Sequence, residues 1–286
     1  FLGYLISEGR STKGNQVWFV NEDSSLVEDF VRSAKEGFGV EAKVFNYKES
    51  AKDVIIFSHA LCQFLEKAFE FKVDGLSKDK VVPALMFESD DRIIREFLSA
   101  LFEGDGYLCV DRQGVNKRRV VYFEYASASK CLAEGVSSLL LRLGVQSVVR
   151  KKIKSSTNSK EKIKRSYYSV YIYGLDNAKK LAGLLDFKGK KAEKLHEIRS
   201  LNYKTNLNLD LIPEINGLVK ELIKSAKIKV KRFKKISPKL VAYYENRCLI
   251  TRQGLEEVLS IIAEHAELSG LSRNIYDYLK TLASSD

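Results

Sequence analysis

One order of predicted elements occurs twice in the first 200 residues, and this duplication limits the fold more than any other feature. Each occurrence begins with an apolar segment that ends at an acidic residue, Glu8 in the first and Asp105 in the second. Two strand candidates, an amphipathic helix, two more strand candidates and another helix follow each time. Because 97 residues separate the two acids, the repeat has the size of a domain and not of a solenoid unit. We therefore predict an α+β fold with two pseudo-symmetric αββαββα repeats, over residues 1–87 and 88–200.

The last part of the chain differs from both repeats. After about residue 200 the strand signals fade, and short amphipathic helical patterns remain. Ser237-Pro238 and Thr251 precede two of these patterns, as residues at a helix N-cap do. We predict a small helical domain over residues 201–286.

The positive charge is concentrated in the middle of the chain. Residues 1–97 carry a net charge of −4, residues 98–200 carry +11 and residues 201–286 carry +4. Such an asymmetry favours a polyanionic partner, most often nucleic acid, over a protein that is merely basic.

The cysteines give no sign of a disulfide framework or of a zinc site. They are scattered and form no C-x-x-C pair, and the three histidines are equally dispersed. Free thiols in a reducing, cytoplasmic location are expected. No apolar run approaches the roughly 20 residues that span a bilayer, so no membrane contact is expected.

Small residues at helical spacing mark both apolar segments that open the repeats. Gly3 and Ser7 lie four residues apart in the first, and Ala100 and Gly104 lie four apart in the second. Residues at this spacing share one face of a helix, and small side chains there allow two helix backbones to approach closely. We predict that the two helices pack in parallel, so that their last turns meet.

This packing brings Glu8 and Asp105 together at two helix ends. Glycine follows each acid, and we predict that Gly9 and Gly106 end the helices in the left-handed conformation. Helix C-termini carry partial negative charge, and neighbouring carboxylates repel each other, so acids are unfavourable there without a cation. Either segment alone could be an ordinary helix end with an exposed acid. Two such acids at matching positions of the repeats favour a site for Mg²⁺, which prefers oxygen ligands and water.

The segments "FLGYLISEG" and "LSALFEGDG" resemble the two motifs of the LAGLIDADG homing endonucleases. The resemblance implies a monomer whose two curved sheets form a saddle over double-stranded DNA, with the motif helices at the interface. It also implies two or three Mg²⁺ ions shared between the motifs, with Mn²⁺ as a substitute and Ca²⁺ as a substitute without cleavage. The implied ligands are Glu8, Asp105, Gly9 and Gly104. The expected reaction is site-specific hydrolysis of both DNA strands, at a long asymmetric site, by metal-activated water.

Family members also use basic residues beyond the last helix of each repeat. In this sequence the resemblance points to Lys80 in the first repeat and to Lys188 or Lys190 in the second, as catalytic helpers. Asn21 is a weaker candidate for positioning solvent, and we favour a helix cap for it.

The sequence also offers candidates for DNA contacts. Basic residues alternate along the predicted strand around Arg150, and two-stranded ribbons fit the major groove. The densest basic run of the last domain, "IKVKRFKKISPK", is a candidate for contacts with flanking DNA. The candidate contact residues are Arg10, Lys13, Lys43, Lys48, Arg118, Arg150, Lys152, Lys154, Lys164, Arg165, Lys231, Arg232, Lys234 and Lys235.

Two other functions stay open on the same scaffold, a DNA-binding regulator that does not cleave and an RNA maturase. Regulators of this type typically lack the acids, which argues against the first. The chain as given does not start with a splicing nucleophile or end with asparagine, so it is not expected to splice. The last domain resembles that of archaeal intein-encoded members. Few glutamines and one methionine among many lysine, glutamate and isoleucine residues are weakly typical of thermophiles.

Overall fold

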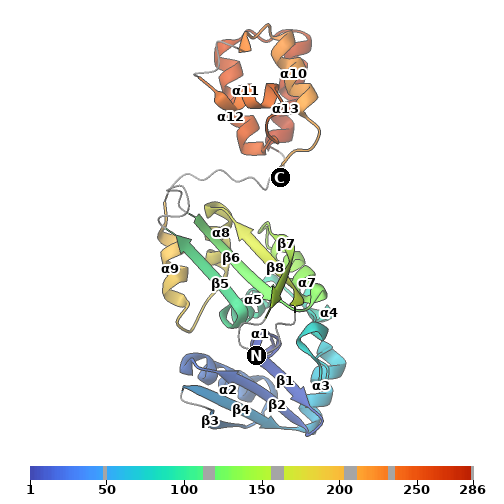
Figure 1. Ribbon diagram of the computed structural model, residues 1–286, viewed down its shortest axis with the longest axis vertical. Coiled ribbons are helices and arrows are strands. Elements are labelled where there is room, and N and C mark those ends of the chain that lie inside the picture. The colour runs from blue at the N-terminus through green and yellow to red at the C-terminus, as the bar shows by residue number, and fades with distance from the viewer. Residues whose placement is uncertain (48–49, 112–119, 156–163, 203–210, 231–235, 285–286) are drawn as a thin grey trace. The chain divides into compact units, whose positions relative to one another are not determined.

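Two four-stranded antiparallel sheets form the framework of residues 1–205 in the computed structural model (Figure 1). The structure describes the whole chain except residues 48–49, 112–119, 156–163, 203–210, 231–235 and 285–286. The chain divides into two units, residues 1–205 and residues 206–286, and each is described by itself.

The first unit contains the same succession of elements twice. The first succession is α1 (Leu2–Glu8), β1 (Gly9–Thr12), β2 (Gln16–Asn21), α2 (Ser24–Phe38), β3 (Ala42–Tyr47), β4 (Ala51–Phe57) and α3 (His59–Phe69). The second is α5 (Asp91–Asp105), β5 (Gly106–Asp111), β6 (Val120–Ser127), α7 (Lys130–Arg142), β7 (Val148–Ser155), β8 (Lys164–Tyr173) and α8 (Leu175–Leu184). The strand orders, β1-β2-β4-β3 and β5-β6-β8-β7, are equivalent. The predicted αββαββα repeats are therefore confirmed.

Short elements complete this unit. They are the 3₁₀ helix η1 (Ser77–Asp79), α4 (Ala84–Glu88) and α9 (Ala192–Ser200).

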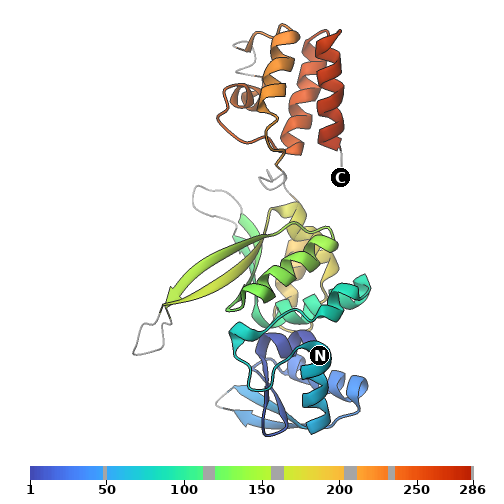
Figure 2. The ribbon, with the colours of Figure 1, turned by 90° about the vertical axis from the view of Figure 1, so that its right-hand side faces the viewer.

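Alternating side chains give each sheet one face against the helices and one open face. On β6, Val121, Phe123 and Tyr125 are buried, while Tyr122 and Glu124 between them remain partly exposed. This alternation follows from the two-residue period of a strand. Figure 2 shows the β7–β8 hairpin projecting from the second sheet, away from the helices.

Helices α1 and α5 pack against each other, as the small residues predict. A Cβ atom on Gly3 would collide with the backbone of α5, at the carbonyl of Phe97 and the amide of Leu101. A Cβ atom on Gly104 would likewise collide with Ser7 of α1. The buried apolar side chains of both repeats join in one continuous core around this contact.

The glycines after the two acids do not adopt the predicted left-handed conformation. Gly9 has φ −100° and ψ 167°, and Gly106 has φ −76° and ψ 147°, so both are extended. They already belong to β1 and β5, which continue directly from the helices. Glycine is needed because a Cβ atom there would collide with the carbonyl of Leu5 or of Phe102 in the preceding turn.

Residues 206–286 form a helical unit with a core of its own. Its helices are α10 (Asn216–Ser225), α11 (Pro238–Tyr244), α12 (Arg252–His265) and α13 (Leu271–Ser284). Ser237 accepts a hydrogen bond from the amide of Leu240, and Thr251 accepts one from Gly254, so both predicted N-caps are confirmed. Within the described residues, every helix is too short or too polar to cross a membrane.

Candidate active site

The carboxylates of Glu8 and Asp105 lie at the adjacent ends of α1 and α5, where the charge of Glu8 acts on Asp105. The protein atoms around Asp105 displace part of its water and, with the nearby Glu8 charge, raise the pKa of Asp105 to about 6. Burial also raises the pKa of Glu8, against an opposing hydrogen bond from Asn21. Ionising either carboxylate therefore carries a cost that a bound cation would reduce.

Two lysines neutralise the helix ends beside these acids. Lys80 donates from Nζ to the carbonyls of Ser7, at 3.2 Å, and of Gly9, at 3.0 Å. Cations at this position offset the partial negative charge of a helix C-terminus. Burial lowers the pKa of Lys80, while the charges of Asp105 and Glu8 oppose this shift.

Lys191 takes the corresponding place at the end of α5. Its Nζ donates to the carbonyls of Phe102 at 3.2 Å, of Gly104 at 2.8 Å and of Gly106 at 2.6 Å. Burial lowers the pKa of Lys191 too, and Glu8 and Asp105 again oppose the shift. The four charged groups therefore form one cluster, with a lysine for each acid.

The two second-repeat lysines predicted from the sequence do not reach this cluster. The Nζ of Lys188 pairs with Asp186, and Lys190 is exposed and uses its backbone amide to bind Asp23. The lysine of this run that reaches the end of α5 is instead Lys191, because the segment before α9 directs its side chain toward the carbonyls there.

Asn21 orients Glu8 instead of capping a helix. Its Nδ2 donates to Oε2 of Glu8 at 2.5 Å, and its Oδ1 accepts from the amide of Asp23 at 2.8 Å. Asp23 is the N-cap of α2, where it accepts from the amide of Ser25. The prediction of a helix cap at Asn21 is therefore wrong, because the cap lies two residues later, at Asp23.

The donor set suits a hard cation that keeps much of its water. Within the described residues, no group of three or more His, Cys, Asp or Glu side chains could hold a metal. Mg²⁺ is commonly bound through only one or two carboxylates together with water and substrate phosphate. Glu8 and Asp105 fit that requirement. The carbonyls of Gly9 and Gly104, also predicted as ligands, already accept hydrogen bonds from Lys80 and Lys191.

On the first sheet, predicted DNA-contact residues lie across the open face. Arg10 on β1 pairs in register with Trp18 on β2, and its guanidinium lies 4.7 Å from the centre of that ring. Lys43 on β3 lies 5.5 Å above the ring of Phe57 on β4. Lys13 is exposed and lies 3.9 Å from Asp74.

On the second sheet, the open face combines basic and aromatic side chains. Arg150 of β7 is exposed beside the stacked rings of Tyr171 and Tyr173, whose centroids are 5.0 Å apart. Lys152 forms an ion pair of 3.0 Å with Glu124 on the same face. Two further candidates, Lys164 and Arg165, are exposed at the start of β8.

Several predicted contacts fall outside the described residues. These are Lys48, Arg118, Lys231, Arg232, Lys234, Lys235 and the side chain of Lys154.

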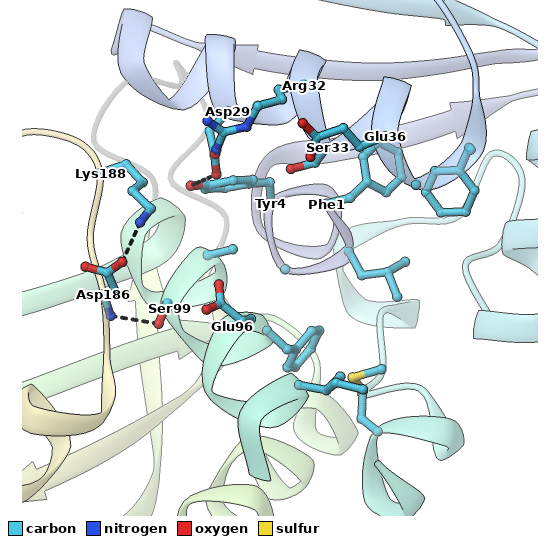
Figure 3. Close-up of a pocket in the computed structure, with 18 residues that line it drawn as sticks. Phe1, Tyr4, Asp29, Arg32, Ser33, Glu36, Glu96, Ser99, Asp186 and Lys188 are labelled. Atoms are coloured by element: carbon cyan, nitrogen blue, oxygen red, sulfur yellow. Dashed lines mark hydrogen bonds and ion pairs between the residues drawn. The ribbon is translucent and has the colours of Figure 1, made fainter. Parts of the chain in front are cut away.

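A cavity of about 630 Å³ opens on another side of the α1–α5 contact (Figure 3). Phe1, Tyr4, Asp29 and Glu96 are among the residues that line it. The four charged groups of the acid–lysine cluster do not line it, so this cavity is distinct from the candidate active site.

Comparison with known proteins supports the interpretation of the repeats. Residues 92–185 match the LAGLIDADG-like domain family. The chain is 30% identical over 284 residues to a replication factor C small subunit from Methanocaldococcus jannaschii, covering 96% of this chain and 14% of that protein. It is 31% identical over 186 residues to a protein of the A-type ATP synthase from Pyrococcus abyssi, covering 63% of this chain and 16% of that protein.

Among solved structures, the complex of I-DmoI with DNA and Ca is 14% identical, with a TM-score of 0.44, over 68% of this chain and 94% of that chain. The family match covers the second repeat, and the equivalent strand order of the first sheet extends the same topology to the first repeat. Residues 92–185 therefore form a LAGLIDADG-like domain.

Proposed function

We propose that this chain is a DNA endonuclease that cuts both strands of a long, asymmetric site in the presence of Mg²⁺. The observation that carries the proposal is the cluster of Glu8 and Asp105 with Lys80 and Lys191 at the adjacent ends of α1 and α5. A binding protein has no need for acids that are costly to ionise at two helix ends, whereas a metal-dependent nuclease does.

The chain's own residues have distinct roles in this proposal. Glu8 and Asp105 hold the metal, which activates a water and stabilises charge on the phosphate when it is bound. Asn21 fixes the orientation of Glu8 through its 2.5 Å hydrogen bond. Lys80 and Lys191 place an ammonium group beside each acid, where it stabilises negative charge that develops on a scissile phosphate.

We further propose that the two open sheet faces bind the DNA, with the basic and aromatic side chains as contacts. Replacing Arg150 by glutamine should weaken binding and make the slope of log Kd against log salt shallower by about 1, because each phosphate contact releases counterions. Fluorescence anisotropy with a labelled duplex would measure both quantities. Lys130→Gln in α7, on the helical face, is the matched control. An unchanged slope for the Arg150 variant would remove β7 from the interface.

The relatives point to a segment that moves between genes. A replication factor and an ATP synthase perform unrelated tasks, yet one protein of each contains a stretch similar to this chain that makes up only 14% or 16% of its length. A sequence inserted into unrelated hosts accounts for this distribution, so we propose an intein-encoded, archaeal origin.

Because one chain carries both acids, it acts as a monomer in this proposal. A cytoplasmic location is proposed with it, as are the repeat boundaries at residues 87 and 88.

Selection of cleaved sites from a randomised duplex library with Mg²⁺ tests the proposal. The expected result is one long site, cut on both strands, with halves that are similar but not identical. Binding to duplex DNA without any cutting would instead favour a regulator. Preferential recovery of RNA with the purified protein would favour a maturase.

A further inference from the structure

The segment that leads to Lys191 is fixed by side chains from both repeats. Four of its backbone amides, those of Asp186, Lys188, Gly189 and Lys190, donate to side-chain oxygens elsewhere in the fold. The first of these bonds, from Asp186 to Ser99 of α5 at 3.0 Å, is visible in Figure 3. Since Lys191 follows directly, these bonds determine where its side chain begins.

Glu103 supplies the strongest part of this attachment. It lies in the motif helix α5, two residues before Asp105, and only 3% of it is exposed. Its Oε1 accepts from the amide of Lys188 at 2.5 Å and from that of Gly189, and its Oε2 lies 3.2 Å from the hydroxyl of Tyr4. Hydrogen bonds to a buried carboxylate are stronger than those between neutral groups.

Asp23 holds the next residue from the first repeat. Its Oδ2 accepts from the amide of Lys190 at 2.9 Å, while its Oδ1 caps α2 at Ser25. A Cβ atom on Gly189 would meet the Asp23 carboxylate, so the glycine permits the close approach. The carboxylates of Glu103 and Asp23 thus accept hydrogen bonds from three consecutive backbone amides. We call this pair of side chains the carboxylate clamp.

The first repeat holds Lys80 in a different way. Leu76 and Asp79, in the short segment before Lys80, bond to each other, with the amide of Leu76 3.0 Å from Oδ2 of Asp79. The residue 97 positions before Glu103 is the apolar Ile6, which lies in the core. Lys80 and Lys191 therefore contact the ends of α1 and α5 in equivalent ways, but the segments that carry them are held by different hydrogen bonds.

We propose that the carboxylate clamp positions Lys191, so that cleavage of one DNA strand depends on Glu103 and Asp23 while cleavage of the other does not. This inference rests on the proposed nuclease function. Glu103 and Asp23 are positioning residues, because both bind backbone amides of the Lys191 segment. Without them the segment loses its fixed path, and the ammonium group of Lys191 leaves the carbonyls at the end of α5.

Chemical labelling of lysines in the metal-free chain tests the clamp without reference to cleavage. An amine-reactive acylating reagent would be applied briefly, and modification of Lys191 and Lys80 quantified by mass spectrometry. In Glu103→Ala the ratio of Lys191 to Lys80 modification should rise about threefold or more, because the segment opens locally. Glu103→Gln keeps an acceptor oxygen and should restore most of the protection. Glu96→Ala, an exposed acid on the same helix, is the control.

Asp23→Ser provides a second variant if Glu103→Ala does not fold. Serine preserves a cap for α2 but removes the second oxygen that accepts from Lys190. The labelling ratio should again rise in favour of Lys191. An unchanged ratio in both Glu103→Ala and Asp23→Ser overturns the clamp.

Strand-specific cleavage then tests its consequence. With a duplex that carries a different label on each strand, Glu103→Ala and Asp23→Ser should slow one strand about tenfold or more and leave the other nearly unchanged, since small misplacements of a catalytic group are costly. Nicked plasmid should accumulate. Equal slowing of both strands overturns the inference. If the wild-type chain cleaves no DNA, the proposed function fails. The labelling ratio still tests whether Glu103 and Asp23 position Lys191.

Discussion

Asp105→Asn should abolish double-strand cleavage while the protein still folds and binds its DNA. Removing one carboxylate from the pair takes away a metal ligand, and metal stabilisation of a phosphoryl transition state contributes several kcal/mol. The cleavage rate should therefore fall on the order of 10³-fold or more. Single-turnover cleavage of the selected site, with Kd measured in Ca²⁺ on the same duplex, would separate the chemical step from binding.

The stability of this variant distinguishes a lost ligand from a lost fold. Partial loss of water and, second to it, the neighbouring Glu8 charge raise the pKa of Asp105, so the neutral amide should leave the stability of the metal-free chain unchanged or slightly higher. Glu88→Gln, at the exposed end of α4, removes one negative charge away from the cluster and should retain cleavage. Full cleavage by Asp105→Asn would exclude the paired acids as the metal site.

Gly3→Leu should destabilise residues 1–205 more than any surface substitution. Its side chain would have to enter the space that the backbone of α5 occupies at Phe97 and Leu101. Overpacking of a tight core costs about 1–3 kcal/mol and sometimes more, and a backbone obstacle places this case at the upper end. A loss of about 3 kcal/mol would lower the Tm by roughly 6–12 °C for a unit of this size. Differential scanning calorimetry would measure the change.

Gly183→Leu is the matched control. Gly183 lies near the end of α8, and a Cβ atom there meets nothing within 4 Å. Leucine is a better helix former than glycine, so this change should leave stability equal or increase it by up to about 1 kcal/mol. Similar Tm losses in both variants would mean that the α1–α5 contact is looser than described.

The fold could be predicted from the sequence because its signals are local and occur twice. Helices and strands followed from apolar periodicity, and the close contact of α1 with α5 followed from Gly3 and Gly104. The conformation of Gly9 was predicted wrongly, because glycine after a helix serves both a left-handed cap and a close approach to the preceding turn. Only the backbone angles of the folded chain distinguish a left-handed cap from an extended glycine close to the preceding turn.

The site was less predictable because its contacts join residues far apart in sequence. The acids could be found from their place in the repeat. Lys191 could not be distinguished from Lys190, because the choice depends on how the preceding segment meets the fold. The run of lysines was the signal, and no local pattern identifies the member that reaches the end of α5. The contacts of Glu103 reach residues 85 and 86 positions away.

The continuous core of residues 1–205 has a consequence for the geometry of any target. The two sheets are not joined by an adjustable linker but share one packed interior, so the distance and the angle between their open faces are fixed. One extra base pair between the two halves of a site would rotate one half by about 35° relative to the other. If the open faces bind DNA as proposed, the target should have no spacer of variable length, and its central base steps should be constrained by geometry even where no side chain touches a base.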